Sequence, residues 1–346
     1  DRSISAAAPP ILSVRQLRMH FPLGGVGLRS KPQGMVKAVD DVSFDLAAGE
    51  TLSLVGESGC GKTTVGRCVL RILKPTAGEV RFGNGGEGSL NVAQLDERSL
   101  VQYRRKVRLV FQDPAASLNP RMTVRDIVGE SLELGRRMSA QQIDARVAEL
   151  LRRVGLRPEV LHRHPHAFSG GERQRISIAR ALAPEPQVVV ADEALSALDV
   201  SVQAQTINLL LELQREFGLS YLFISHDLSV VHHLSDRVGV MYVGKMVEVG
   251  PVEQIFSRPR HPYTAALLQS APVPDPRRRQ RTGVIKLAGE VPDPAHLPAG
   301  CHFAPRCPHA QERCRTELPV LRTVGTQEVA CHRAEALELA GVAPPA

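Results

Sequence analysis

The sequence is poor in aromatic residues and has no tryptophan, since Phe, Trp and Tyr make up only 4% of its 346 residues. Proteins that bind single-stranded nucleic acid usually stack bases on aromatic side chains, so this composition argues against such a surface. No apolar run approaches the roughly 18 residues that a membrane-spanning helix needs. The sequence does not start with a charged region followed by an apolar one, so a secretory signal is not indicated. We therefore expect a cytoplasmic protein, and we find no internal repeat.

The bulk composition is that of an ordinary soluble globular protein, with 43% hydrophobic and 23% charged residues. The length allows one large domain or two modest ones. The formal net charge is +7, which suits nucleic acid, an anionic membrane surface or a phosphate-rich ligand without choosing among them. A mildly basic protein with none of these partners is equally compatible with the composition.

Short apolar runs alternate with stretches of helical periodicity. Strands are predicted at 11–21, 36–46, 51–56, 186–192 and 219–225, with a hairpin at 237–250. Helices are predicted at 59–73, 119–156 and 201–218. This alternation predicts an α/β fold with a parallel sheet covered on both faces. The helical block at about 114–186 then forms an inserted subdomain.

The remaining segments are expected to connect or extend this domain. Residues 1–10 predict a flexible N-terminus, and residues 24–34 form a loop rich in Gly and Pro. We expect the main domain to cover 11–262 and a C-terminal extension to cover 263–346. The extension starts with a linker rich in Pro and Arg; the arginines at 277–281 fit a solvated linker, or alternatively a contact with anionic lipid.

A glycine-rich loop follows the predicted strand at 51–56. Residues 56–63 read GESGCGKT, which fits the phosphate-binding pattern G-x-x-x-x-G-K-[ST] between a strand and a helix. Its backbone amides surround phosphate oxygens, Lys62 supplies a positive charge, and the Thr63 hydroxyl can hold Mg²⁺. A glycine-rich turn with an incidental lysine is the alternative. The candidate nucleotide-binding residues are Gly56, Glu57, Ser58, Gly59, Cys60, Gly61, Lys62, Thr63 and Thr64.

Two carboxylates end the apolar run VVVADE, and acids in such a place need a cation near them. A nucleotide bound by a phosphate loop needs a carboxylate at the end of a nearby strand to hold Mg²⁺, and Asp192 fits this role. Glu193 follows and can orient the water that attacks the γ-phosphate and accept its proton. A helix cap is the alternative interpretation of this pair without the phosphate loop.

A second anion-binding pattern occurs at Ser169, Gly170 and Gly171, directly before a predicted helix. One γ-phosphate needs only one such loop, so these residues can serve the nucleotide of a partner subunit. GTPases and motor ATPases also carry phosphate loops, so further motifs must decide the class.

From about residue 11 to 262 the sequence resembles the ATP-binding cassette (ABC) ATPases, with every diagnostic motif in order. GESGCGKT resembles their Walker A motif, SGGER at 169–173 their signature, and VVVADE their Walker B. Gln112 in VFQDP matches the Q-loop, Asp199 in SALD the D-loop, and His226 in ISHD the switch histidine. Phe21 stands where the family stacks an aromatic ring on adenine. Ala194 and Leu195 depart from the Pro-Thr that the family favours after the catalytic Glu.

The resemblance implies a RecA-like core with an antiparallel β subdomain and an inserted helical subdomain. It also implies a dimer that encloses ATP between two subunits. One ATP would face Lys62, Thr63, Gln112, Asp192, Glu193 and His226, with Mg²⁺ held by Thr63, Gln112 and Asp192. Ser169, Gly170 and Gly171 would close on the ATP of the facing subunit, and Asp199 would touch that subunit. Taken alone, His226 is more commonly a structural histidine.

The C-terminal part narrows the resemblance. Residues 256–276 (FSRPRHPYTAALLQSAPVPDP) resemble the tail of ATPases from dipeptide and oligopeptide importers, and the chain looks most like the F-type subunit, which pairs with a D-type one. This implies two permease subunits, a solute-binding protein, no nucleic acid, and a place on the cytoplasmic face of the bacterial inner membrane. Importers of nickel or another solute, exporters, and soluble ABC ATPases acting on nucleic acid are alternatives. The last usually carry two cassettes, whereas this chain has one.

Four cysteines lie in the extension, with the spacing C-x5-C-x6-C-x16-C: Cys301, Cys307, Cys314 and Cys331. Four thiolates suit Zn²⁺ or an iron–sulfur cluster. Structural zinc usually has a closely spaced pair, which is missing, so we favour [4Fe–4S], and the resemblance implies the same cluster. Zinc, reduced thiols and disulfides remain open. The neighbouring His302, His309 and His332 are predicted to flank this site, and Cys60 and Cys68 to have no role in it.

Overall fold

The computed structural model describes residues 9–24, 34–83, 89–111, 113–133, 138–270 and 289–342. Four predictions fall on residues outside these ranges: the flexible start of the chain, most of the loop at 24–34, the Q-loop residue Gln112, and the linker at 273–281.

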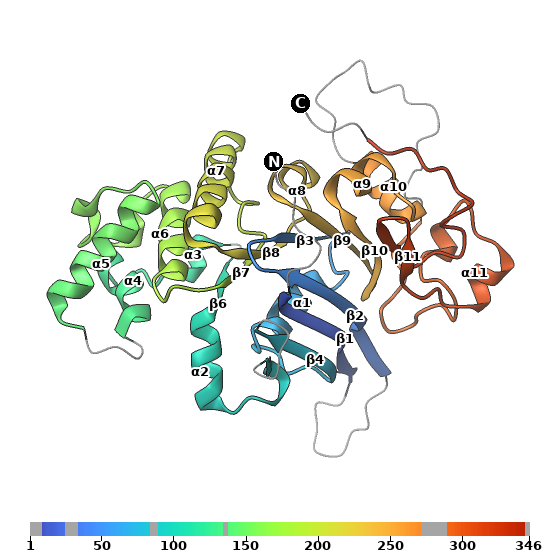
Figure 1. The fold of residues 1–346 in the computed structure, drawn as a ribbon, viewed down its shortest axis with the longest axis horizontal. Helices are drawn as coiled ribbons and strands as arrows, with labels where there is room; N and C mark the ends of the chain where they lie inside the picture. Colours follow the sequence, from blue (N-terminus) through green and yellow to red (C-terminus); the bar gives the residue numbers. More distant parts are fainter. Residues whose placement is uncertain are drawn as a thin grey trace.

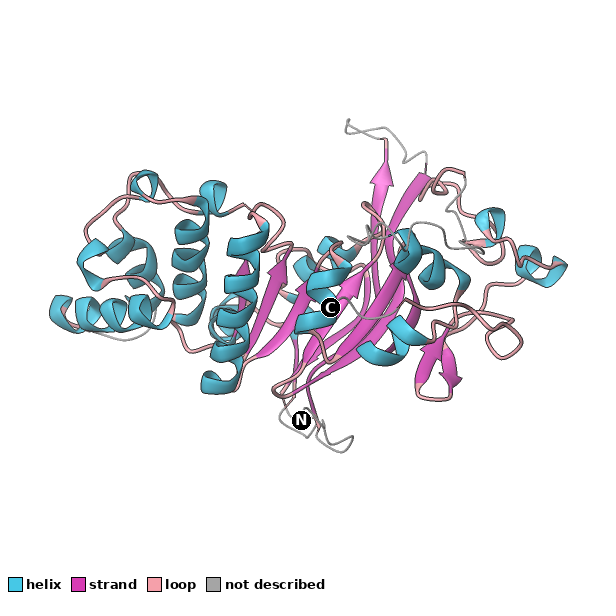
Figure 2. Cartoon of the chain, turned by 90° about the horizontal axis from the view of Figure 1, so that it is seen from above, coloured by secondary structure: helices cyan, strands magenta, loops and turns pink. Residues whose placement is uncertain are grey.

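The central feature is an eight-stranded sheet with the order β11-β12-β10-β9-β3-β8-β7-β6, which runs through the middle of Figure 2. Its parallel part consists of β3 (Thr51–Val55), β6 (Val107–Val110), β7 (Val188–Asp192), β8 (Ser220–Ile224) and β9 (Arg237–Tyr242). Every residue of β3 and β8 is buried, as in a parallel sheet with both faces covered. The predicted parallel α/β sheet is therefore confirmed.

The other end of this sheet is antiparallel. β10 (Lys245–Pro251) pairs with β9, which confirms the predicted hairpin, and β12 (Gln327–Val329) pairs with β10. β11 (Arg322–Val324) completes the sheet. Strands from the C-terminal extension thus continue the sheet of the main domain.

A second, antiparallel sheet has the order β2-β1-β4-β5. Its strands are β1 (Pro10–Leu23), β2 (Gly34–Ala47), β4 (Ala77–Phe82) and β5 (Leu90–Asn91). Helix α1 (Lys62–Val69) lies between the two sheets (Figure 1), and its buried side chains join apolar residues of both in one core. α2 (Glu97–Lys106) leads from this sheet into β6, after the short 3-10 helix η1 (Val92–Gln94).

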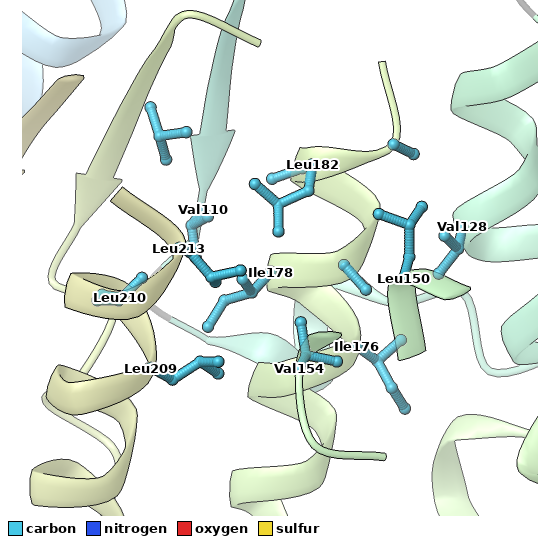
Figure 3. Close-up of a cluster of buried hydrophobic side chains, with 14 of the residues drawn as sticks. Val110, Val128, Leu150, Val154, Ile176, Ile178, Leu182, Leu209, Leu210 and Leu213 are labelled. Atoms are coloured by element: carbon cyan, nitrogen blue, oxygen red, sulfur yellow. The ribbon is translucent and has the colours of Figure 1, made fainter. Parts of the chain in front are cut away.

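A helical group lies at one end of the central sheet, to the left in Figure 1. It contains α3 (Pro114–Ser117), α4 (Val124–Glu133), α5 (Ala140–Arg153), η2 (Pro158–Val160), η3 (Pro165–Ala167) and α6 (Gly170–Leu182). Figure 3 shows that Ile178 and Leu182 of α6 project toward Val110 of β6 and Leu213 of α7 (Val200–Phe217). Leu150 on α5 lies on the other side of α6 (Figure 3). α6 therefore joins the helical group to the sheet.

Two helix boundaries differ from the predicted ones. The helix predicted at 59–73 covers Lys62–Val69, because Gly59 and Gly61 adopt positive φ angles of 80° and 107° and build a loop first. The long helix predicted at 119–156 consists of α4 and α5, and α5 starts with a capping box in which Ser139 and Gln142 exchange hydrogen bonds.

The C-terminal residues fold against the main domain beside β9 and β10. They contain α10 (Pro262–Ser270), η5 (Ala304–Arg306) and α11 (Glu312–Thr316), whereas α8 (Leu228–Leu234) precedes β9 and α9 (Val252–Ser257) follows β10 within the main domain. The buried carboxylate of Glu248 on β10 accepts hydrogen bonds from the backbone N–H groups of Arg260 (2.7 Å) and His261 (3.0 Å). It also accepts one from the Gln327 amide at 3.2 Å, which ties α10 and β12 to the same strand.

None of the helices in the described ranges combines the length and the apolar character that crossing a membrane would require.

Candidate functional site

The loop after β3 is shaped by glycines that no other residue could replace without moving the backbone. Gly56 has φ 151° and Gly61 has φ 107°. A Cβ atom on Gly56 would lie 2.2 Å from the carbonyl oxygen of Met241, and one on Gly61 would lie 2.1 Å from that of Ala38. The loop therefore presses against β9 and β2, and its curvature depends on both glycines.

Lys62 starts α1 and is almost fully buried, with 5% of its surface exposed. Its ammonium donates hydrogen bonds to the carbonyl oxygens of Gly56 (2.8 Å) and Glu57 (3.0 Å). Cys60 Sγ lies 3.6 Å from the same nitrogen. The loop thus holds the charge of Lys62 inside its own curve, where an anionic ligand would meet it.

The loop and the end of β7 meet through two side chains. The Thr63 hydroxyl donates a hydrogen bond to Asp192 Oδ1 at 3.0 Å. Burial and, to a smaller degree, the neighbouring Glu193 charge raise the pKa of Asp192, against the effect of the Thr63 hydrogen bond. A partly buried carboxylate beside a hydroxyl fits a divalent cation with oxygen ligands, because such an ion would compensate the charge.

Glu193 directly follows β7 in a left-handed conformation with φ 47°, unusual for a residue with a side chain. Its N–H donates to the carbonyl of Ile224 at 2.9 Å, which fixes the turn to the end of β8. His226 Nδ1 lies 3.3 Å from Glu193 Oε1, and the His226 side chain is 60% exposed. Strain of this kind concentrates at functional sites, because the surrounding structure must hold it in place.

Ala194 and Leu195 are buried, with 4% and 3% of their surface exposed, in the apolar core shared with the helical group. Both residues therefore pack directly behind the turn at Glu193, and nothing in the structure explains their departure from the family's pattern.

The predicted residues for a facing subunit lie at two exposed helix starts. Ser169 caps α6 through a capping box with Glu172, and both Ser169 and Gly170 are exposed. Asp199 caps α7 by accepting a hydrogen bond from the N–H of Val202 at 3.0 Å, a bond that lowers the pKa of this carboxyl group. A Cβ atom on Gly171 would lie 2.6 Å from a methyl carbon of Val202, so the two helix starts are neighbours.

Phe21 lies in β1 opposite Val36 of β2, and its side chain is partly buried. Nearby, His20 Nε2 lies 3.1 Å from Asp40 Oδ1, and Lys245 Nζ lies 3.2 Å from Asp40 Oδ2. Within the described residues, Phe21 forms no hydrogen bond with the phosphate loop. Gln112 lies outside the described residues.

Sequence reasoning missed two residues that hold the phosphate loop from the C-terminal side. Arg306 forms a bidentate ion pair with Glu57, at 2.8 and 3.1 Å, and the Tyr263 hydroxyl accepts a hydrogen bond from the Glu57 N–H at 2.8 Å. Both lie more than 200 residues away in the chain, so no local pattern could have revealed them.

The four cysteines of the extension line a single cavity, together with His309, His332 and the apolar residues Phe303 and Ala304. Burial raises the pKa of both Cys301 and Cys331 to about 11, and it also raises that of Cys307. All four are free thiols. His302 lines a neighbouring cavity. Within the described ranges, however, no group of three or more His, Cys, Asp or Glu side chains is placed to hold a metal ion.

Comparison with known proteins decides the family. The ABC transporter family matches residues 39–196, and the family of the oligopeptide/dipeptide transporter C-terminal region matches residues 247–314. The chain is 50% identical to the oligopeptide transport ATP-binding protein AppF of Bacillus subtilis over 323 residues, 93% of this chain and 97% of AppF. The chain belongs to the ABC transporter ATP-binding proteins.

Other members of the ABC family support the same placement. The dipeptide transport ATP-binding protein DppF of Haemophilus influenzae is 50% identical, over 90% of this chain and 93% of its own length. Among solved structures, the ADP- and phosphate-bound dimer of the cassette MJ0796 matches with a TM-score of 0.61 and 28% identity, over 70% of this chain and 98% of the cassette. The resemblance to ABC ATPases and their mixed α/β fold is therefore confirmed.

Proposed function

We propose that this chain is the ATP-hydrolysing subunit of an ABC importer that takes up dipeptides or oligopeptides through separate permease subunits. The hydrogen bond between Thr63 and Asp192 carries the ATPase part of this proposal, because it joins the phosphate loop to the carboxylate that follows the VVVA run. The match of residues 247–314 to the oligopeptide/dipeptide transporter C-terminal region supports peptides as the transported solute.

The proposed site binds ATP by the amides of residues 56–64, with Lys62 beside the β- and γ-phosphates. Thr63, Asp192 and Gln112 would hold Mg²⁺, which when bound neutralises charge that develops on the phosphate oxygens. Glu193 orients the attacking water and accepts its proton, and His226, 3.3 Å away, holds the Glu193 carboxylate in place. Phe21 is proposed to contact the adenine.

A second ATPase subunit completes the site in this proposal. Ser169, Gly170 and Gly171 bind the γ-phosphate of the ATP held by the partner, and Asp199 contacts the partner directly. The exposure of Ser169, Gly170 and Asp199 supports this assignment. We propose a related D-type subunit as the partner, in a complex with two permeases and a solute-binding protein on the cytoplasmic face of the bacterial inner membrane.

Reconstitution tests the proposal. Expressed with two peptide permeases and a D-type subunit, the chain is expected to co-purify with them, and ATP turnover should rise when peptide-loaded binding protein is added. Stimulation by a nickel-loaded binding protein instead would change the solute but keep the ATPase. Turnover that responds to nucleic acid and ignores the permeases would overturn the importer assignment.

We further propose that Cys301, Cys307, Cys314 and Cys331 hold a [4Fe–4S] cluster. The observation that supports this proposal is that all four cysteines line one cavity, whose walls also include apolar residues; they would have to move closer together to bind the cluster, since no three of them are placed to hold a metal ion in the described residues. Burial raises the pKa of the Cys301 and Cys331 thiols to about 11, and a bound cation would favour their ionised forms. The cluster would stabilise the fold of a segment that has little apolar core of its own.

Metal analysis checks the cluster. Protein purified without oxygen is expected to be brown, with iron and acid-labile sulfide in equal amounts. Cys331→Ala should lose both, whereas Cys68→Ala, at a buried cysteine inside the main core, should keep both. Zinc without sulfide in the wild-type protein, or a folded extension free of any metal, would contradict the cluster.

A further inference from the structure

Glu57, the second residue of the phosphate loop, is held through its side chain and both of its backbone polar groups. Its carboxylate pairs with Arg306, its N–H donates to the Tyr263 hydroxyl, and its carbonyl accepts from Lys62 Nζ at 3.0 Å. Two of these three partners come from the C-terminal part of the chain. Glu57, which precedes most of the phosphate-binding amides, is thus held in place by residues outside the phosphate loop.

Arg306 is buried, since its side chain is only 4% exposed, while that of Glu57 is 25% exposed. Both terminal nitrogens of Arg306 donate to Glu57, and one also donates to the Tyr242 hydroxyl at 3.2 Å. A planar guanidinium that meets a carboxylate with two parallel hydrogen bonds is rigid as well as strong. Removing one partner would leave the other charge unpaired in a poorly solvated place.

The support behind Arg306 is continuous with the cysteine segment. Arg306 ends η5 and is followed directly by Cys307. The rings of Tyr242, Tyr263 and Phe303 pack on one another with centroid distances of 4.5 to 5.5 Å, and the Arg306 guanidinium lies 5.8 Å from the Tyr242 ring centroid. Displacement of η5 would therefore move Arg306 away from Glu57.

We propose that Arg306 is a positioning residue for the phosphate loop, through which the C-terminal extension sets the affinity for ATP. The inference rests on the proposed ATPase function. With Arg306 in place, the Glu57 charge is neutralised and the loop keeps its curve. Without it, an uncompensated carboxylate sits in the loop that must receive the phosphates. Because linkage is reciprocal, ATP in turn stabilises the segment around η5.

Arg306→Gln is expected to raise the Kd for ATP about tenfold or more in the full chain, while kcat at saturating ATP changes less than threefold. The double variant Glu57→Gln with Arg306→Gln should recover most of the affinity, because neither charge is then left alone. Arg313→Gln is the matched control: it removes an exposed arginine from a pair with Glu317 in the same extension and should leave the Kd unchanged.

Hydrogen exchange provides a test that needs no variant to fold. Binding of ATP to the wild-type chain should slow exchange of the backbone amides of residues 301–307. A folded Arg306→Gln variant, as a second comparison, should lose this slowing. Wild-type affinity in a folded Arg306→Gln variant, or no change in exchange at 301–307 in ATP-bound wild type, would overturn the inference. If the wild-type chain binds no ATP at all, the proposed function fails instead.

Discussion

Replacing Glu193 with Gln is expected to lower ATP turnover at least a hundredfold while the Kd for ATP stays within a few-fold of wild type. A positioned general base contributes about 10²- to 10⁴-fold, and the amide keeps the size of the side chain but cannot accept the proton of water. The left-handed turn, the hydrogen bond to Ile224 and the packing of Leu195 should hold the new side chain in place. Phosphate release and equilibrium nucleotide binding measure the two quantities separately.

Glu212→Gln is the matched control for this prediction, because Glu212 is an exposed acid on α7 outside the proposed site. It should turn over ATP at the wild-type rate. Substantial hydrolysis by Glu193→Gln would mean that another group accepts the proton, and it would remove the main reason for the turn at Glu193. A loss of ATP binding would instead mean that Glu193 contributes to binding ATP before hydrolysis begins.

Replacing Lys62 with Ala is expected to weaken ATP binding at least a hundredfold, equivalent to about 3 kcal/mol. The ammonium lies inside the loop on the carbonyls of Gly56 and Glu57, so its charge is placed before any nucleotide arrives. Little ordering is then needed when phosphate binds, and the whole attraction is lost with the side chain.

Lys74→Ala controls for the loss of a positive charge near α1, since Lys74 is exposed. Its affinity for ATP should be unchanged at the same ionic strength. Calorimetric titration without Mg²⁺ and with it would show whether Lys62 acts on the phosphates themselves. Near-normal binding by Lys62→Ala in both conditions would contradict the assignment of residues 56–64 as the phosphate loop.

The sequence was informative wherever chemistry and local structure coincide. The apolar run before Asp192 and the run at 219–225 were recognisable as strands because four and five consecutive buried residues, respectively, at the centre of a parallel sheet read as unbroken apolar runs. The phosphate loop was recognisable because its glycines are required by backbone clashes rather than by fine packing. Thr63 and Asp192 were expected near the same cation, and they lie 3.0 Å apart.

Features that join distant segments left no such signature. The ion pair of Arg306 with Glu57 links positions 249 residues apart, and neither residue type is unusual where it stands. The left-handed φ of Glu193 could not be anticipated, because glycine or asparagine usually occupies such turns. The pairing of β12 with β10 was missed because a strand of three residues shows no periodicity.

The pairing of β12 with β10 also determines which strand forms the edge of the central sheet. Without β11 and β12, β10 would be the outermost strand of the sheet and would present unpaired N–H and C=O groups along an almost fully buried, apolar sequence. An exposed edge strand of this kind can pair with strands of other molecules and lead to aggregation. The short hairpin of β11 and β12 covers this edge, because β12 pairs with β10 at Glu248 and Val249. The exposed Glu328 adds a charge there. The hairpin of β11 and β12 therefore covers an edge at which β10 could otherwise pair with a strand of another molecule.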